Sequence, residues 1–141
     1  MASAHARRKP RRNAKLTSSL LRGKGAGPES VTRCTKAADL SVSQLTAIVI
    51  SPMARCWGTT DPDDWFPVAA RRDRARTEAA RALQTCAVCP VRAQCLELSL
   101  RQWHAGGRHG VWGGLIAADR VDAHRRWLAG APVTALLAGS G

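Results

Sequence analysis

The sequence has no tyrosine, only one phenylalanine and no long run of apolar residues. Aromatic residues make up 4% of the 141 residues, although apolar residues as a whole reach 45%. Much of that apolar share is alanine, which buries little area, so the chain can form only a thin hydrophobic core. A small domain of this kind often depends on a bound metal or on disulfides, and five cysteines are present for either purpose.

No segment has the roughly 20 apolar residues that a bilayer-spanning helix needs. The N-terminus is basic, but no apolar signal core follows it. An arginine-rich, acid-poor start also fits an organellar transit peptide. We expect a soluble cytoplasmic protein with no membrane partner, in which the thiols are reduced and disulfides are not the default interpretation of the cysteines.

Acidic residues are scarce, with 10 Asp and Glu against 22 Lys and Arg, which gives a formal charge of +12. Most of the excess lies in the first 24 residues, which contain no acid. This basic arm includes Arg7, Arg8, Lys9, Arg11 and Arg12. Such an arm attracts nucleic acid through counterion release, although charge runs are often only solvated tails. We predict that residues 1–52 form a disordered basic extension with one short helix over residues 36–50.

Strand patterns are absent, and the spacing of apolar residues predicts helices instead. Residues 71–85 are rich in the good helix formers arginine and alanine. A second helix is expected from Pro90 to about Trp103, and a third over residues 117–128. The sequence therefore predicts an all-α fold, a small bundle of about three to five short helices. The domain would span residues 53–128, with an apolar tail at residues 129–141 that holds one weak helical turn.

Four of the five cysteines follow a pattern that suits a metal centre. Cys86 and Cys89 form a C-x-x-C pair, five residues separate Cys89 from Cys95, and Cys56 must fold back from an earlier loop. Four thiolates satisfy either a tetrahedral zinc ion or an iron–sulfur cluster. Because only one pair is present, the spacing favours a cluster, which can span scattered sulfurs, but it leaves zinc and redox or structural thiols open. Cys34 is interpreted as a spare thiol.

Two further motifs accompany the cysteines. An Asp-Pro-Asp-Asp-Trp-Phe-Pro loop occupies residues 61–67, and a Gly-Val-Trp-Gly-Gly turn occupies residues 110–114. Together with the cysteine spacing, these motifs resemble the WhiB-like (Wbl) family of actinobacteria and their phages, over about residues 53–128. The combination is highly specific, whereas either half alone would be only moderately so.

The resemblance implies an all-helical fold around one 4Fe–4S cluster per chain, and a transcription factor rather than an enzyme. It implies that the cluster ligands are Cys56, Cys86, Cys89 and Cys95. The implied partners are the C-terminal domain of the principal sigma factor of RNA polymerase, and promoter DNA. The implied sigma contacts are Trp65, Phe66, Gly110, Val111, Trp112, Gly113 and Gly114. The DNA contacts would be Arg120, Arg125 and Arg126, with the basic arm as a further candidate.

The aromatic residues in these motifs carry their own expectations. Trp65 and Phe66 are adjacent in a polar loop, so we expect both to cover part of the core. Glycines permit positive φ, so Trp112 is expected at the tip of a tight turn, exposed as an interface anchor. The alternative interpretation is that Trp112 fills the small core.

Three functions compete at this point. The first is a redox- or nitric-oxide-responsive transcription regulator. The second is a protein disulfide reductase that uses Cys86 and Cys89 in the cluster-free form, although the usual βαβ context of such enzymes is missing. The third is a structural zinc module that binds nucleic acid through the basic arm. The uncharged C-terminal tail departs from the family pattern of a basic tail, so DNA contact from that end is thinner than usual.

Overall fold

The computed structural model describes residues 36–58 and 61–139, and within these ranges all regular structure is helical. The predicted arm residues Arg7, Arg8, Lys9, Arg11 and Arg12, and also Cys34, lie outside the described residues. The described part contains six α-helices and three short 3-10 helices and no strand, which confirms the all-α class and exceeds the predicted three to five helices. No helix in these ranges is long and apolar enough to cross a membrane.

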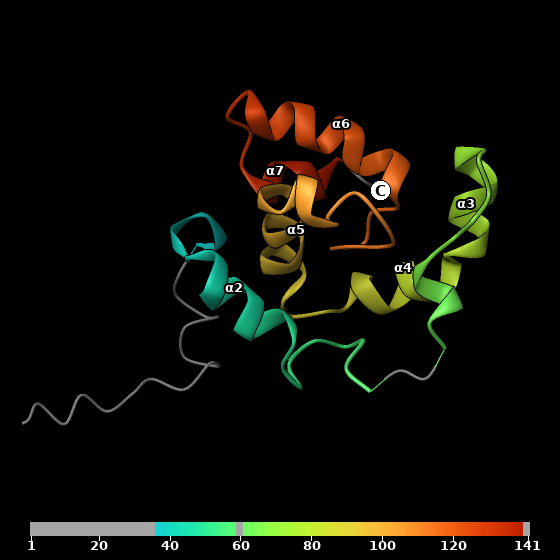
Figure 1. The fold of residues 1–141 in the computed structure, drawn as a ribbon, viewed down its shortest axis with the longest axis horizontal. Helices are drawn as coiled ribbons and strands as arrows, with labels where there is room; N and C mark the ends of the chain where they lie inside the picture. The colour runs from blue at the N-terminus through green and yellow to red at the C-terminus, as the bar shows by residue number, and fades with distance from the viewer. Residues whose placement is uncertain (1–35, 59–60, 140–141) are drawn as a thin grey trace, which may run out of the picture.

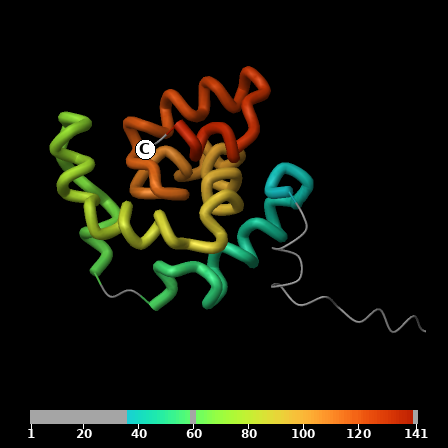
Figure 2. Tube along the Cα trace, turned by 180° about the vertical axis from the view of Figure 1, so that it is seen from behind, coloured from blue at the N-terminus to red at the C-terminus, as the bar shows by residue number. Residues whose placement is uncertain are grey.

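In chain order the elements are η1 (Ala37–Asp39), α2 (Val42–Val49), η2 (Asp63–Trp65), α3 (Arg72–Glu78), α4 (Ala80–Ala87), α5 (Arg92–Arg101), η3 (Trp103–Ala105), α6 (Ala117–Leu128) and α7 (Val133–Ala138). Helix α5 lies at the centre, with α6 and α7 on one side of it (Figure 1). Helix α2 lies at one end of the molecule, and α3 and α4 lie together at the opposite end. The view from behind shows the same arrangement (Figure 2).

Helix α2 forms where the sequence predicts a short helix. Ser41 caps its N-terminus: the Ser41 hydroxyl accepts a bond from the Gln44 amide, and the Gln44 side chain accepts one from the Ser41 amide. Leu45 and Ile48 are buried and pack against α5. Pro52 disfavours helix in the residue before it, so the helix ends as predicted.

The predicted helix at residues 71–85 is split in two at Ala79. Its backbone there has ψ of 7°, far from the helical value near −42°, and the chain continues as α4. The inner face is made of alanines as expected, since Ala75, Ala79 and Ala82 are all buried. Because α4 extends to Ala87, Cys86 lies in its last turn and not beyond its end.

Helix α5 is shorter than predicted, because it begins after Val91 and ends at Arg101, and Trp103 belongs to η3. Arg101 ties the end of α5 to the preceding segment. It pairs with the buried carboxylate of Glu97 at 2.7 Å and donates to the carbonyls of Ala38 and Leu40 at 2.7 and 2.6 Å. Residues 36–40 are thereby fixed against α5.

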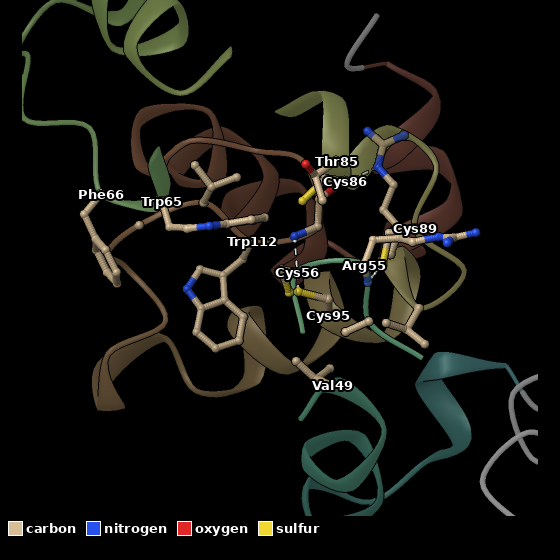
Figure 3. Close-up of a pocket in the computed structure, with 16 residues that line it drawn as sticks. Val49, Arg55, Cys56, Trp65, Phe66, Thr85, Cys86, Cys89, Cys95 and Trp112 are labelled. Atoms are coloured by element: carbon tan, nitrogen blue, oxygen red, sulfur yellow. Dashed lines mark hydrogen bonds between the residues drawn. The ribbon is translucent and has the colours of Figure 1, made fainter. Parts of the chain in front are cut away.

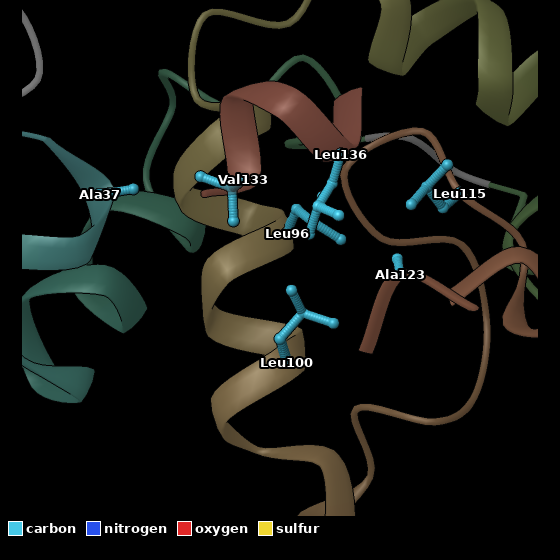
Figure 4. Packing of buried hydrophobic residues seen from close by; sticks show 7 residues of the cluster. All are labelled: Ala37, Leu96, Leu100, Leu115, Ala123, Val133 and Leu136. Atoms are coloured by element: carbon cyan, nitrogen blue, oxygen red, sulfur yellow. The ribbon is translucent and has the colours of Figure 1, made fainter. Parts of the chain in front are cut away.

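Helix α6 has the predicted bounds, and the tail beyond it forms α7 rather than one weak turn. Val133 and Leu136 of α7 are buried against α5 and α6. They belong to a set that we call the aliphatic core, drawn in Figure 4. The aliphatic core consists of Ala37, Leu96, Leu100, Leu115, Ala123, Val133 and Leu136.

Tryptophan and histidine side chains cover one edge of α6. His124 stacks on Trp103, with ring centroids 4.3 Å apart and an angle of 7° between the planes. The rings of His124 and Trp127 are also stacked, with centroids 6.0 Å apart. These two tryptophans pack between helices, and burial, together with the nearby His104, lowers the pKa of His124.

Candidate metal centre

The four predicted ligand cysteines reach one cavity from different elements. Cys56 comes from the loop after α2, Cys86 from the last turn of α4, Cys89 from the α4–α5 connection, and Cys95 from α5. All four line a cavity of about 300 Å³, which we call the cysteine cavity (Figure 3). Cys56 and Cys95 are 39 positions apart in the sequence, yet both line this cavity, because the loop that carries Cys56 folds back as the spacing requires.

Main-chain amides face three of these sulfurs. The Arg55 amide donates to the Cys89 sulfur at 3.5 Å, and the Gly113 amide donates to the Cys95 sulfur at 3.3 Å. The amide of Gly114 donates to the sulfur of Cys86. Such bonds stabilise negative charge on sulfur, so these amides lower the pKa of the thiols that they face.

Burial opposes ionisation of the free thiols. It raises the pKa of Cys95 to about 12 and that of Cys86 to about 11, against the opposing effect of the amide bonds. The pKa of Cys56 is also raised, by burial first and by the nearby Cys89 second. At neutral pH the free thiols of Cys56, Cys86 and Cys95 are therefore protonated, and a metal group bound there would displace their protons.

A glycine turn, residues 110–114, forms the wall that carries two of the amides. Trp112 and Leu115 bond to each other through both main-chain groups, at 3.1 and 3.0 Å. Between them Gly113 and Gly114 have φ of 57° and 78°, and positive φ at both central positions is what a type I′ turn requires. A Cβ on Gly113 would lie 2.7 Å from the Cβ of Leu96, so only glycine lets the turn approach α5 this closely.

This turn geometry corrects the expectation for Trp112. The two glycines occupy the tip, while Trp112 lies at its base, partly buried, with its indole N–H donating to the His109 carbonyl at 2.9 Å. It packs against the cluster of α2 and α5 residues that includes Leu45. The neighbouring Val111 is buried, with 8% of its surface exposed. Trp112 therefore fills part of the core and lines the cavity at the same time.

The aromatic loop docks onto the start of the glycine turn. The Val111 amide donates to the Trp65 carbonyl at 2.8 Å, and a Cβ on Gly110 would lie 2.9 Å from the Phe66 ring. Trp65 is partly buried as expected, but Phe66 is 58% exposed, which corrects the prediction that both rings cover the core. Figure 3 shows Trp65, Phe66 and Trp112 on one side of the cavity.

Arg120 corrects the predicted DNA contacts. It is completely buried on α6, and its guanidinium donates to main-chain carbonyls of residues 107–115, so it has no surface to offer a nucleic acid. Burial lowers its pKa to about 10, which leaves it charged at neutral pH. Arg125 and Arg126 are exposed, and Arg125 also pairs with Asp122 at 3.3 Å.

Sequence reasoning missed some residues of this site. Arg92 and Thr85 also line the cysteine cavity, and the Nε of Arg92 donates to the Gly113 carbonyl at 3.0 Å. A helical spacing signal was available for Arg92, which precedes Cys95 by three positions and so shares its face of α5. The polar contacts of Arg120 had no comparable signal, because its acceptors are main-chain groups.

Comparison with known proteins assigns the family. The model of the family described as transcription factor WhiB matches residues 52–122, just over half of the chain. The chain belongs to the WhiB family. The match includes all four cavity cysteines and the glycine turn, whereas α2 and α7 lie outside it. WhiB proteins are transcription factors and generally bind iron–sulfur clusters. No curated protein and no solved structure matches this chain.

Proposed function

We propose that the chain is an iron–sulfur transcriptional regulator that binds the principal sigma factor and promoter DNA and responds to redox change or nitric oxide. The observation that carries this proposal is the single cavity of about 300 Å³ lined by all four cysteines. A ligand set made only of cysteine sulfur is the set that holds 4Fe–4S clusters. Membership of the WhiB family supports the same assignment. The ligands would be Cys56, Cys86, Cys89 and Cys95.

The arrangement of the sulfurs favours a cluster over a single zinc ion. Structural zinc needs four ligands at about 2.0–2.3 Å from one point. Among the described residues, no three Cys, His, Asp or Glu side chains are grouped so that they could hold one metal ion. The cysteines instead surround a volume, which fits a polynuclear group. When bound, a 4Fe–4S cluster supplies iron that reacts with oxygen and nitric oxide.

Anaerobic purification of the full chain tests this assignment. We expect a brown protein that contains about four iron and four sulfide per chain, as a single 4Fe–4S cluster requires. A colourless protein with one zinc per chain would contradict the proposal and support the structural zinc module instead.

The proposed sigma-binding surface is the aromatic side of the cavity. Phe66 is 58% exposed and lies against Gly110, and the partly buried Trp112 adds an edge to the same region. An exposed aromatic ring next to a rigid turn is a usual anchor of protein interfaces. Since Val111 is buried, its part in this surface would be to hold the turn in place and not to touch the partner.

A pull-down with the C-terminal domain of the principal sigma factor tests this surface. Phe66→Ala and Trp112→Ala are expected to remove binding while the visible absorbance of the cluster persists. Leu128→Ala is the matched control, because Leu128 is also an exposed apolar residue, at 67%, but lies at the end of α6. Unchanged binding by both aromatic variants would contradict the proposed surface.

The proposed DNA contacts are Arg125, Arg126 and the basic arm at residues 7–12. Each phosphate contact releases counterions, so the affinity for DNA should fall with rising salt. Replacing Arg125 and Arg126 together by Gln should reduce that salt dependence by about one contact each. An unchanged slope of affinity against salt would exclude these two residues and leave the arm to be tested by deletion.

The disulfide reductase alternative has weaker support. A reactive thiol of this kind needs a lowered pKa, whereas burial raises the pKa of Cys86 to about 11. A reductase assay on cluster-free protein, with Cys89→Ser as the control, decides this alternative. Disulfide reduction by the cluster-free protein that is lost in Cys89→Ser would support the reductase alternative.

A further inference from the structure

Arg120 is the largest side chain that is completely buried in the described part of the protein. Its guanidinium donates to the carbonyls of Gly107, His109, Gly110 and Leu115 at distances between 2.6 and 3.1 Å. A buried cation is costly unless its donors are satisfied, and the planar fork of arginine satisfies them here with main-chain oxygen. A lysine has only three donors on one atom and cannot reproduce this pattern.

The same segment faces sulfur on its other side. All four acceptors of Arg120 lie in residues 107–115, and within that stretch the amides of Gly113 and Gly114 donate to Cys95 and Cys86. The indole of Trp112 is fixed to the His109 carbonyl, which Arg120 also holds. The segment 107–115, which contains the glycine turn, therefore lies between two candidate ligand sulfurs and one guanidinium, which bonds to Gly110 of the turn and to three carbonyls beside it.

We propose that Arg120 is the positioning residue of the metal centre, which holds the glycine turn so that its amides face Cys86 and Cys95 and thereby sets the lifetime of the cluster. This inference rests on the proposed function, because it assumes that the cysteines hold the cluster. Arg120 acts through the turn and forms no hydrogen bond to a candidate ligand in the described residues, while its charge also interacts with Cys95 across the turn. If the bound group is lost, the amides of Gly113 and Gly114 lose their charged sulfur acceptors, whereas the hydrogen bonds from Arg120 to the carbonyls remain.

The test compares cluster lifetimes among matched variants of the full chain. Arg120→Lys keeps the charge and removes the fork. Arg76→Lys makes the same change on α3, where Arg76 binds Asp119 and not the turn. Leu136→Ala weakens the aliphatic core and leaves the turn intact. The readout is the decay of visible absorbance under anaerobic conditions with an iron chelator.

Arg120→Lys is expected to speed this decay about 10- to 100-fold, the usual effect of losing a partner that orients metal ligands. The two control variants are expected to decay within about twofold of the unaltered protein, since neither changes the contacts that orient the ligands. Each variant is compared at the urea concentration that gives it the same free energy of unfolding. Equal decay of Arg120→Lys and Leu136→Ala under these matched conditions would overturn the proposal, because Arg120 would then act only through global stability.

Hydrogen exchange of the cluster-free protein gives a second readout, which does not depend on the cluster. Arg120→Lys is expected to speed exchange of the Gly113 and Gly114 amides while the amides of α2 stay protected. Faster exchange in both regions alike, or in neither, would overturn the positioning role. If the unaltered protein binds no cluster, the proposed function fails, yet this measurement still decides the role of Arg120.

A measurement on the unaltered protein applies if Arg120→Lys does not fold. The Nε–H of Arg120 and the amides of Gly113 and Gly114 are expected to exchange with the same opening free energy, because one clamp holds them all. Exchange of the two amides while the guanidinium stays protected would overturn the proposal.

Discussion

The two sides of α5 pack against very different neighbours. On one side, Leu96 and Leu100 pack against aliphatic side chains of α6 and α7 in the aliphatic core, whose interior consists of side chains of this chain. On the other side, Cys95 faces the cysteine cavity of about 300 Å³, whose walls are thiols, turn amides and aromatic rings. One helix thus borders both a packed aliphatic core and a cavity lined by the four cysteines.

The difference explains how a chain with so few large apolar residues can be stable. The aliphatic core is thin, since two of its seven members are alanines. In the cysteine cavity the fold instead gathers thiols, and the raised pKa values of Cys86 and Cys95 keep these two protonated in the metal-free protein. Part of the folding free energy is therefore expected to come from metal binding, as in other small metal-stabilised domains.

The strongest test of this comparison removes one ligand. Cys95→Ser should abolish the visible absorbance and bring iron and sulfide to background, because a hydroxyl on the inner face of α5 replaces a thiolate that a cluster needs. Iron and sulfide analysis after anaerobic purification measures the effect. Cys34→Ser is the matched control and should retain full metal content. A Cys95→Ser protein that stays brown would place the ligand elsewhere.

The aliphatic core should respond in the opposite way. Leu136→Ala is expected to lower the free energy of unfolding by about 2–5 kcal/mol, because it leaves a cavity among packed side chains. Urea unfolding should show the same loss with and without the cluster. The exposed Leu128→Ala should change stability by less than about 0.5 kcal/mol. A Leu136→Ala loss that vanished in cluster-free protein would show that the two sides of α5 do not fold independently of the metal.

The pH dependence of cluster-free protein sharpens the comparison further. The pKa values of Cys86 and Cys95 in the folded chain, about 11 and about 12, lie above the ordinary value of 9.0. Between pH 9 and these values the unfolded chain has released thiol protons that the folded chain still binds, so the free energy of unfolding should fall as pH rises through this window.

Urea unfolding of cluster-free protein at several pH values above 8 measures this slope. The sequence contains no tyrosine, but the pKa of Arg120, about 10 in the folded chain, lies in the same window and acts in the opposite sense, so comparison with the double variant isolates the thiol contribution. The double variant Cys86→Ser and Cys95→Ser should flatten the slope, while the aliphatic core contributes none. A slope that the double variant leaves unchanged would assign the effect to other groups.

The smallest expected effect concerns the polar contact between α3 and α6. Arg76 bonds to both carboxylate oxygens of Asp119, at 3.0 and 2.9 Å, with the Arg76 side chain 55% exposed. Arg76→Ala should lower the free energy of unfolding by about 1 kcal/mol or less, because exposed ion pairs contribute little. Thermal unfolding at low and high salt measures it, and the difference from the unaltered protein should shrink at high salt. A larger loss that salt does not change would mean that this contact is shielded from solvent.

The helices and the convergence of the cysteines follow from local patterns. Residues 117–128 form α6 with the predicted bounds, because its composition and the flanking glycines leave little ambiguity. The break at Ala79 had no such signal, since arginine and alanine on both sides favour a continuous helix. Cys95 follows Val91 by four positions and precedes Leu98 by three, and this helical spacing places it on the same face as these two buried residues.

The glycine turn and Arg120 show where sequence reasoning ends. The pattern predicted a tight turn but not its type, and the type decides that Gly113 and Gly114, and not Trp112, form the tip. The family resemblance implied a DNA contact for Arg120, which agrees with the usual exposure of charged residues on helices. Its burial depends on carbonyl groups that converge only when the turn folds, and these groups have no representation in the side-chain pattern.

The division of α5 between two environments also limits how the chain can vary in length. Successive residues in an α-helix are rotated by about 100°, so inserting or deleting one residue within α5, between Arg92 and Cys95, would turn the Cys95 sulfur away from the cavity that it shares with Arg92. The same change would turn Leu96 out of the aliphatic core. Substitutions within α5 can be absorbed one side at a time, whereas a single-residue insertion or deletion disturbs both sides together. The spacing of five residues between Cys89 and Cys95 is therefore fixed by the packing of both faces of α5 and not by the cysteine cavity alone.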